Sequence, residues 1–297
     1  MKIALYGDFI TDIYSWASLT RFCPEQADAP IYDLLTDDRE FLGCAGNVAA
    51  NIAAAVRFFD NSSENELTIF GSIGRSTLGK LFRSPIMKNV KLNTENVKCY
   101  DNSIVKQRIV LDEKIACRID SSRYFCGSHD DREVTVGKYD LLIVSDYCFG
   151  GVEEKLCRDL INNSEISVVD TKRKDLSFYN GATAFKFNRS EYEKFISGEI
   201  IPSDWIVVSK GSHGCSVIES SKRVVRTNMP AWPANEIDVT GCGDTFTSVL
   251  GLALAHGKGI EMAAYAANYI ASKVVSRFGP AVPTSEELLT ALEKGII

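Results

Sequence analysis

Asn235-Glu-Ile-Asp-Val-Thr-Gly-Cys-Gly-Asp-Thr-Phe246 is the stretch around which the rest of the chain can be interpreted. Gly241 and Gly243 flank one small residue, which lets the backbone curl so that successive N–H groups point at one spot. The apolar, periodic run from Phe246 to Ala255 predicts a helix directly afterwards. Because the start of a helix carries free N–H groups and the positive end of the helix dipole, this stretch predicts an anion site suited to phosphate oxygens.

Asp244 falls in the first turn of that predicted helix. The dipole favours the ionised carboxylate there and keeps it available to accept a proton. An anion site with an adjacent base is what phosphoryl transfer to an alcohol requires. Short glycine motifs also occur in ordinary turns, so a glycine-rich turn capped by Asp244 is an equal alternative on spacing alone.

The composition bounds the class of protein. The chain has 297 residues, of which 45% are hydrophobic and 24% charged, as is usual for a soluble globular protein. This length supports one large α/β domain, or one domain with a small appendage. The net charge of −6 and the lack of a long basic run disfavour nucleic-acid binding. No apolar run approaches the ~20 residues of a membrane span.

The cysteines and histidines bear on compartment and metal binding. Nine cysteines are scattered singly, and none forms a C-x-x-C pair. We therefore expect a reduced, cytoplasmic protein with small buried thiols rather than a disulfide framework or a zinc site. The N-terminal run Met1–Asp8 is interpreted as a first strand and not as a signal peptide. With three histidines, metal binding through imidazole is not expected.

From residue 139 onward the pattern alternates between apolar strand, polar turn and helix. Each predicted strand ends in polar residues, so one rim of a mostly parallel sheet should collect Asp, Lys, Asn, Glu and Gly side chains. The segments that follow the strands are Ser145–Tyr147, Asp170–Lys172, Asn188–Glu191 and Lys210–Gly214. The sequence thus predicts a single α/β domain over residues 1–297.

The N-terminal part adds carboxylates and a β segment. Lys2–Tyr6 is predicted to be a strand that ends at Gly7-Asp8, with Asp12 four residues later. A carboxylate at the carboxyl end of a central strand is in the usual ligand position of an open α/β sheet, although turn formation explains the same residues. Residues 14–42 suggest a small β appendage.

Two further segments carry polar or basic candidates. Asn47 and Asn51 lie one turn apart at the start of a predicted helix over Val48–Phe59, and so share a face. A hairpin pattern over Ile104–Ile119 carries Lys106, Arg108 and Arg118. These cations fit either a phosphate-binding surface or a solvated edge strand that resists aggregation, with equal weight.

Together these motifs resemble the ribokinase-like (PfkB-type) carbohydrate kinases over almost the whole chain. The resemblance rests on the motif Asp238-x-Thr240-Gly241-x-Gly243-Asp244, the Asn188-x-x-Glu191 element, the Gly211-x-x-Gly214 loop, and the helix entry with Gly43, Asn47 and Asn51. It implies a three-layer α/β sandwich with a central, mostly parallel sheet and a small β lid. It also implies an ATP-dependent carbohydrate kinase.

Within that family the chain is most similar to heptose 7-phosphate kinase domains of bifunctional heptose enzymes. The echoes include Gly7-Asp8, Arg21-x-x-Pro24-Glu25, Ser145-Asp146-Tyr147 and Asp170-x-Lys172. They imply D-glycero-D-manno-heptose 7-phosphate as substrate, phosphorylated at the anomeric position. A kinase for another sugar or a nucleoside, and a catalytically silent ligand-sensing relative, are the alternatives.

The resemblance also implies a role for each candidate residue. Asp244 is the base, and the N–H groups of Gly241, Cys242 and Gly243 stabilise the transferred phosphoryl group. Asn188 and Glu191 hold Mg²⁺ through water, while Lys172, Gly211, Gly214 and Asn268 border ATP. The sugar hydroxyls are bound by Asp12, Asn47 and Asn51. A phosphate already on the sugar is bound by Arg21, Lys106, Arg108 and Arg118.

The lid segments, at about 14–42 and 95–125, would exclude water and pair two subunits into a homodimer. The resemblance does not decide whether a monovalent cation assists the reaction. Four positions depart from the family pattern: Cys44 replaces a usual glycine, Cys242 a usual alanine and Thr171 a common proline, and Arg75 stands where an acidic residue is common.

Overall fold

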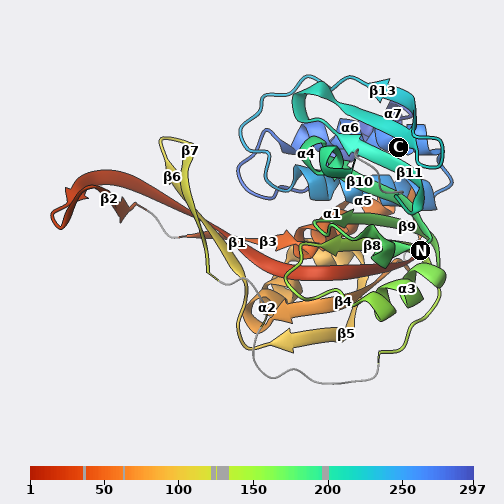
Figure 1. The fold of residues 1–297 in the computed structure, drawn as a ribbon, viewed down its shortest axis with the longest axis horizontal. Coiled ribbons are helices and arrows are strands. Elements are labelled where there is room, and N and C mark those ends of the chain that lie inside the picture. Colours follow the sequence, from red (N-terminus) through yellow and green to blue (C-terminus); the bar gives the residue numbers. More distant parts are fainter. Residues whose placement is uncertain (36–37, 63, 122–124, 126–133, 196–200) are drawn as a thin grey trace.

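The structure is a computed structural model that describes residues 1–35, 38–62, 64–121, 125, 134–195 and 201–297. One continuous sheet runs through the molecule in the strand order β13-β12-β11-β10-β9-β8-β1-β4-β5 (Figure 1). The strands from β11 to β5 in this order pair in parallel, and β12 and β13 add an antiparallel edge. The predicted α/β class with a mostly parallel sheet is confirmed.

The elements of this body follow one another as strand and helix. The strands are β1 (Lys2–Cys23), β4 (Glu66–Gly74), β5 (Lys91–Tyr100), β8 (Tyr139–Asp146), β9 (Ser164–Thr171), β10 (Ala182–Asn188), β11 (Ser203–Ser209), β12 (Cys215–Glu219) and β13 (Val224–Met229). The helices are α1 (Ala45–Phe59), α2 (Arg75–Arg83), α3 (Glu154–Asn162), α4 (Arg189–Tyr192), α5 (Cys242–Ala255), α6 (Ile260–Val274) and α7 (Ser285–Glu293).

Alternation along the strands builds a core on each face of the sheet. In β1, Ile3 and Leu5 pack into the cluster formed with α1, α2, α5, α6 and α7, while Ala4 and Tyr6 pack into the cluster formed with α3. Side chains of period two point to opposite faces of a strand, so a strand buried on both faces is apolar throughout. The result is the three-layer sandwich that the family resemblance implied.

The carboxyl ends of the parallel strands meet at one edge, as predicted. Asp146 ends β8, Thr171 ends β9 directly after Asp170, Asn188 ends β10 and Ser209 ends β11. Neighbouring strands keep these residues level, because Asp146 is in register with Thr171 and Asn188 with Ser209. Polar side chains from distant parts of the sequence therefore share one rim.

β1 differs from its prediction. It does not end at Tyr6 but continues to Cys23, so that one strand belongs to both the body and a lid. Its outer part pairs with β2 (Gln26–Leu34), β3 (Arg39–Cys44) and β6 (Val105–Leu111), and β6 pairs with β7 (Lys114–Asp120). Figure 1 shows the β1–β2 hairpin extending away from the body. A strand can leave a sheet in this way only if its outer residues find new partners for their backbone groups.

The two segments proposed as a lid fall on several strands. The segment 14–42 lies in β1, β2 and β3, and 105–120 lies in β6 and β7. Residues 95–100, however, belong to β5, which pairs with β4 at the edge of the main sheet. Residues 36–37 and 122–124 of the two segments lie outside the described residues.

The helix predictions hold to within a few residues at each end. α1 begins at Ala45 rather than at Val48, after Cys44 with φ of 50°, and α5 begins at Cys242 rather than at Phe246. In the described part of the chain, no helix combines the length and hydrophobicity needed to cross a membrane.

Candidate active site

Asp244 lies in the first turn of α5, and two neutral side chains hold its carboxylate. Asn47 Nδ2, on α1, donates to Oδ2 at 2.8 Å, and the Tyr147 hydroxyl donates to Oδ1 at 3.2 Å. Gly241 precedes α5 with φ of +80°, and a Cβ there would lie 2.5 Å from Asn47 Nδ2. Glycine at this position is therefore required both by the backbone conformation and by the contact that places Asn47 against the base.

The environment sets the proton affinity of Asp244. Burial raises its pKa to about 6, the hydrogen bond from Asn47 opposes that rise, and the negative charge of Asp170 adds to it. A carboxylate with this pKa is mostly ionised at neutral pH, yet binds a proton more readily than an exposed aspartate does. That balance is suited to a general base.

The loop Asp238–Gly243, called the signature loop below, is fixed by the Asp238 carboxylate. This carboxylate accepts from Thr240 N at 2.9 Å, Gly279 N at 3.0 Å and the Tyr14 hydroxyl at 2.7 Å. Cys242 N donates to Val239 O at 3.2 Å, so this N–H is engaged within the loop. For Gly243 N, no acceptor occurs among the described residues. Of the three predicted anion-binding N–H groups, Cys242 is thus the least available.

A cavity of about 780 Å³ opens beside the signature loop. It brings together five residues predicted to border the nucleotide or its metal: Lys172, Asn188, Gly211, Gly214 and Asn268. Gly214 is required there, because a Cβ would lie 2.0 Å from Met229 O. Asn268 Nδ2, on the wall of the cavity, donates to Pro230 O at 2.8 Å. Tyr147, Gly241 and Gly243 line the same cavity, which therefore extends to the base.

Asn188 and Glu191 form a capping box at the start of α4. Asn188 Oδ1 accepts from Glu191 N at 2.9 Å, and Glu191 Oε2 accepts from Asn188 N at 2.8 Å. Lys172 Nζ makes a further short contact with Glu191 Oε1. The pair that was predicted to hold Mg²⁺ therefore already has a structural role, which leaves contact through water as its route to an ion.

The chemistry of the rim still fits a magnesium ion. Asp170 is buried, and its Oδ1 has no hydrogen-bond donor in the described part of the chain, although Lys172 Nζ lies 3.6 Å from it. Carboxylate oxygens are the ligands that Mg²⁺ prefers, and the ion keeps several waters when substrate phosphates supply its other ligands. No cluster of three or more acidic, histidine or cysteine ligands occurs among the described residues.

Asp12, Arg108 and Lys106 lie where β1 meets β6. Arg108 makes a short ion pair with Asp12, and both side chains are almost completely buried. Lys106 Nζ lies 4.8 Å from the ring centre of Tyr147 and 3.5 Å from Cys44 Sγ. In the described part of the chain, no carboxylate is within ion-pair distance of Lys106. This half-buried cation faces the ring whose hydroxyl holds Asp244.

Three predicted sugar-side residues lie elsewhere. Asn51 is fully buried and donates to Asn47 O and Oδ1 at 2.9 and 3.1 Å, so it orients Asn47 from behind. Arg118 is opposite Arg108 in the β6–β7 register but is exposed and paired with Asp120 at 2.9 Å. Arg21 is exposed in the outer part of β1, in register with Ile31 of β2. It is nine residues beyond Asp12, a span of roughly 30 Å along a strand.

Asp8 has a structural role rather than the ligand role considered from the sequence. Its carboxylate is fully buried and accepts from the backbone N–H groups of Tyr147, Phe149 and Gly151 at 2.8–3.1 Å. Burial raises the pKa of this carboxyl to about 6, and the negative charge of Asp146 adds to that rise. Asp8 thereby fixes the loop that carries Tyr147.

Sequence reasoning assigns no role to Tyr147 or Lys186, although both line the cavity beside the base. Tyr147 was noted only as part of a motif that follows a strand. Lys186 could have been found as a lysine between Phe185 and Phe187 in an otherwise apolar strand. A charge in the middle of such a strand needs a buried partner.

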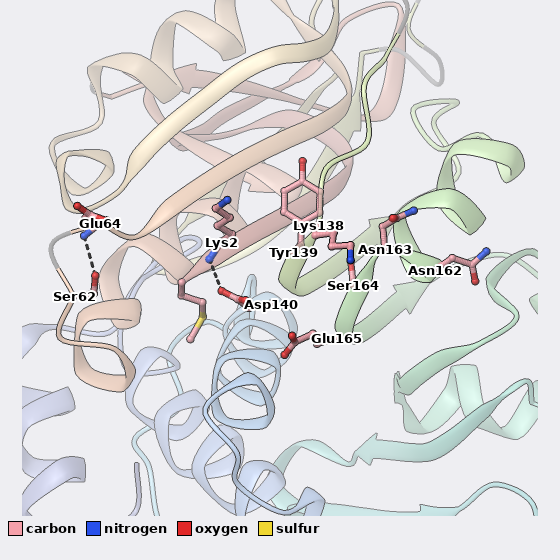
Figure 2. A pocket seen from close by; sticks show the side chains of 11 residues that line it. Lys2, Ser62, Glu64, Lys138, Tyr139, Asp140, Asn162, Asn163, Ser164 and Glu165 are labelled. Atoms are coloured by element: carbon pink, nitrogen blue, oxygen red, sulfur yellow. Dashed lines mark hydrogen bonds between the residues drawn. The ribbon is translucent and has the colours of Figure 1, made fainter.

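A second depression, of about 610 Å³, lies at the opposite edge of the sheet (Figure 2). It is formed at the amino ends of β1, β8 and β9, where Lys2 N donates to Asp140 Oδ2 at 2.7 Å. Figure 2 shows Lys2, Asp140 and Glu165 among the residues that line it. Ligand sites of open α/β sheets lie at the carboxyl ends of the strands, so the cavity beside Asp244 is the better candidate.

The chain is similar to proteins of known family and fold. The model of the pfkB family of carbohydrate kinases matches residues 24–287. The bifunctional protein HldE of Pasteurella multocida is 29% identical over 312 residues, which cover 98% of this chain and 63% of that protein. The chain thus spans less than two thirds of the length of this relative.

Two solved structures share the fold over nearly the whole chain. Arabidopsis thaliana ribokinase complexed with ribose and ATP has a TM-score of 0.67 at 15% identity, with 98% of each chain covered. Escherichia coli phosphofructokinase-2 in complex with potassium has a TM-score of 0.69 at 15% identity, also with 98% of each chain covered.

Proposed function

Because the chain belongs to the pfkB family of carbohydrate kinases, and is therefore an ATP-dependent sugar kinase, we propose that its acceptor is a sugar that already carries a phosphate. The compound most consistent with the sequence motifs is D-glycero-D-manno-heptose 7-phosphate, phosphorylated at the anomeric hydroxyl. The similarity to HldE supports this choice. The adenylyltransferase activity of bifunctional heptose enzymes is not part of the proposal.

The observation that carries the proposal is Lys106. It lies against the Tyr147 and Phe149 rings, 4.8 and 5.1 Å from their centres, with no carboxylate partner in the described part of the chain. Arg108, by contrast, is neutralised by Asp12. A partly buried cation without a counter-charge is costly unless a ligand supplies one. A phosphate on the sugar would supply it.

The residues of the site divide the transfer step among them. The acceptor hydroxyl gives its proton to Asp244 as its oxygen attacks the terminal phosphorus of ATP. The new O–P bond forms while the bond to the β-phosphate oxygen breaks, and the electron pair leaves with ADP. The N–H of Gly243 and the helix dipole of α5 stabilise the charge on the transferred group. Asn47 and Tyr147 keep Asp244 aimed at the hydroxyl.

We place Mg²⁺ near Asp170 Oδ1, with Asn188 and Glu191 contacting it through water. When bound, the ion supplies neutralisation of the phosphate charges. Asp12 and Asn47 remain our candidates for the sugar hydroxyls, and Asn51 orients Asn47. Gly211, Gly214 and Asn268 border the nucleotide in the cavity. A monovalent cation stays a prediction.

We further propose that the protein is a cytoplasmic homodimer that pairs through the lid. Large apolar side chains are exposed on the lid strands, among them Phe22 (54%), Leu34 (60%) and Ile119 (54%). An extended hairpin with apolar residues in water is a candidate subunit interface. The cysteines of the described residues are all free, which supports a reducing compartment.

A coupled assay of ADP release over matched pairs of sugars tests the substrate. Heptose 7-phosphate and heptose, and hexose phosphates and hexoses, should differ strongly in favour of the phosphorylated member, with heptose 7-phosphate best. Preference for a free sugar or a nucleoside would overturn the proposal. No turnover on any compound would favour the silent ligand-sensing alternative.

Lys106→Met tests whether the Lys106 ammonium binds the phosphate of the sugar. It should raise KM for the phosphorylated sugar roughly tenfold or more, since a charge-assisted contact is lost. KM for ATP should change little. Lys114→Met, an exposed lysine at the start of β7 in the same lid hairpin, is the control and should leave both KM values unchanged.

A further inference from the structure

Lys186 is a buried lysine whose position nothing in the motifs explains. It lies on β10, where Phe185 and Phe187 point to the α3 side of the sheet and Ala184 and Lys186 to the α5 side. The side chain is 4% exposed. An ammonium group removed from water costs several kcal/mol unless partners satisfy it, so its surroundings must explain its presence.

The ammonium is fixed between Asp170 and the signature loop. Lys186 Nζ donates to Asp170 Oδ2 at 2.8 Å, and Thr247 of α5 donates to the same oxygen at 3.2 Å. A Cβ added to Gly243 would lie 2.8 Å from Lys186 Nζ. Because glycine has no side chain, the ammonium reaches the backbone at the start of α5, where the terminal phosphate groups are expected.

The ammonium has donors left over. It carries three N–H groups, and among the described residues Asp170 is its only acceptor. Lys186 lines the cavity of about 780 Å³, so the remaining donors have access to a ligand there. Buried donors are as a rule satisfied. The start of a helix repels a cation and attracts an anion, so an anion bound between Lys186 and α5 would satisfy both.

The charges around Asp170 indicate that this carboxylate positions the Lys186 ammonium but leaves some of its N–H donors available. Lys172 Nζ lies 3.6 Å from Asp170 Oδ1, on the other side of the same carboxylate. Burial alone would raise the pKa of Asp170, but the two lysines hold it below its usual value. Lys172 is also paired with Glu191, whereas Lys186 has no second carboxylate within ion-pair distance in the described part of the chain.

We propose that Lys186 is a phosphate-binding catalytic residue, which donates to the terminal phosphate oxygens of the nucleotide at Gly243 and to the phosphoryl group during transfer. This rests on the kinase activity described above. Lys186 remains protonated throughout: the acceptor proton goes to Asp244, the O–P bond forms at the terminal phosphorus, and the electron pair of the broken bond leaves with ADP. Lys186 stabilises the negative charge that is redistributed.

The alternative is that Lys186 serves only as the buried partner of Asp170. Calorimetric binding of adenosine, AMP, ADP and a non-hydrolysable ATP analogue distinguishes the two. With Lys186→Met, ADP and the analogue should bind roughly tenfold or more weakly. Adenosine and AMP should bind within about twofold of wild type. Equal weakening of all four ligands, or no weakening, would overturn the proposal.

Two further variants guard against misfolding and a general charge effect. Lys186→Met combined with Asp170→Asn removes both charges of the pair and should recover the thermal stability lost in the single variant, while ADP binding stays weak. Recovered ADP affinity in the double variant would show a purely structural role and sink the proposal. Lys222→Met, an exposed lysine between β12 and β13, should leave the whole series unchanged.

These binding measurements need no sugar. The role of Lys186 can therefore fail while the sugar-phosphate proposal stands, and the reverse also holds.

Discussion

Charged side chains are buried at the rim of the sheet and exposed on the outer part of the lid. At the rim, Asp244, Asp170 and Glu191 are buried and each has named partners. On the lid, Arg21 and Arg118 are exposed, and so are large apolar side chains such as Phe22. Buried polar networks fix one geometry because an unsatisfied member is costly, whereas exposed ion pairs contribute little. The rim is therefore built before substrate binds, and the lid still has surface to bury.

The two arginines of the β6–β7 hairpin show the boundary between these regions. Arg108 and Arg118 face each other in the strand register. Arg108 reaches inward to Asp12 and is buried, while Arg118 reaches Asp120 at the surface. The two residues are of one type and form a cross-strand pair, but Arg108 lies on β6, next to β1 and Asp12, whereas Arg118 lies on the outer strand β7. The difference in burial therefore follows from the distance of each strand from the body.

The largest effect is expected at the rim. Asp244→Asn preserves the shape of the side chain but removes the base, so kcat should fall by about 10²–10⁴-fold. ATP binding should be nearly unchanged, since Asp244 is not a proposed nucleotide contact. Single-turnover kinetics and calorimetry measure the two quantities. A variant with a near wild-type rate would remove Asp244 from the role of base.

The next effect contrasts the two hairpin arginines. Arg108→Met leaves the buried Asp12 carboxylate without its partner, and should lower the free energy of unfolding by about 3–5 kcal/mol. Arg118→Met removes only an exposed pair and should change it by less than about 0.5 kcal/mol. Denaturant midpoints at constant m-value provide the comparison. Equal effects of the two substitutions would show that the boundary between rim and lid is not where the structure places it.

The same boundary separates what the sequence could predict from what it could not. The rim residues follow strands directly, so local pattern places Asp170, Asn188 and Gly211 at one edge once the sheet is parallel. The turn from Gly241 into α5 is also local. What brings Asn47 to Asp244 is long-range packing of α1 against α5, and only the family resemblance suggested it.

The lid could not be predicted in the same way. Gly7 and Asp8 resemble the end of a strand, because glycine and aspartate usually terminate one. Here Gly7 is retained for close packing, since a Cβ would lie 2.3 Å from Ser145 O, and Asp8 caps three backbone N–H groups of a neighbouring loop. Tertiary contacts thus override the local signal, and β1 continues. Lys186 was missed for a related reason, since its partner Asp170 lies 16 residues earlier in the chain.

A smaller effect tests how Tyr147 tunes the base. The hydrogen bond from Tyr147 lowers the pKa of Asp244, which burial has raised to about 6. Tyr147→Phe removes this donor, so the pKa should rise and the acidic limb of kcat/KM should move to higher pH, by less than about one unit because Asn47 still donates. The rate should fall at pH 6 and hardly change at pH 8. Tyr139→Phe, at the opposite edge of the sheet, should leave the limb in place; a Tyr147→Phe profile reduced equally at every pH would contradict the tuning role.

The smallest effect on turnover is expected at the tip of the lid. Substitutions there nevertheless test the proposed homodimer. Phe22→Lys with Leu34→Lys places charges on a surface that we propose is shared between two subunits, and burying unpaired charges there is unfavourable. Light scattering should therefore show a dimer for the wild type and a monomer for the variant. Because oligomerisation stabilises the folded state by mass action, the thermal midpoint of the variant should not depend on protein concentration. Val224→Lys, an equally exposed apolar residue on β13 (47%), should remain dimeric. A wild type that is monomeric at micromolar concentration would contradict the proposed homodimer. The exposed apolar residues of the lid would then be expected to pack over the active site of their own chain.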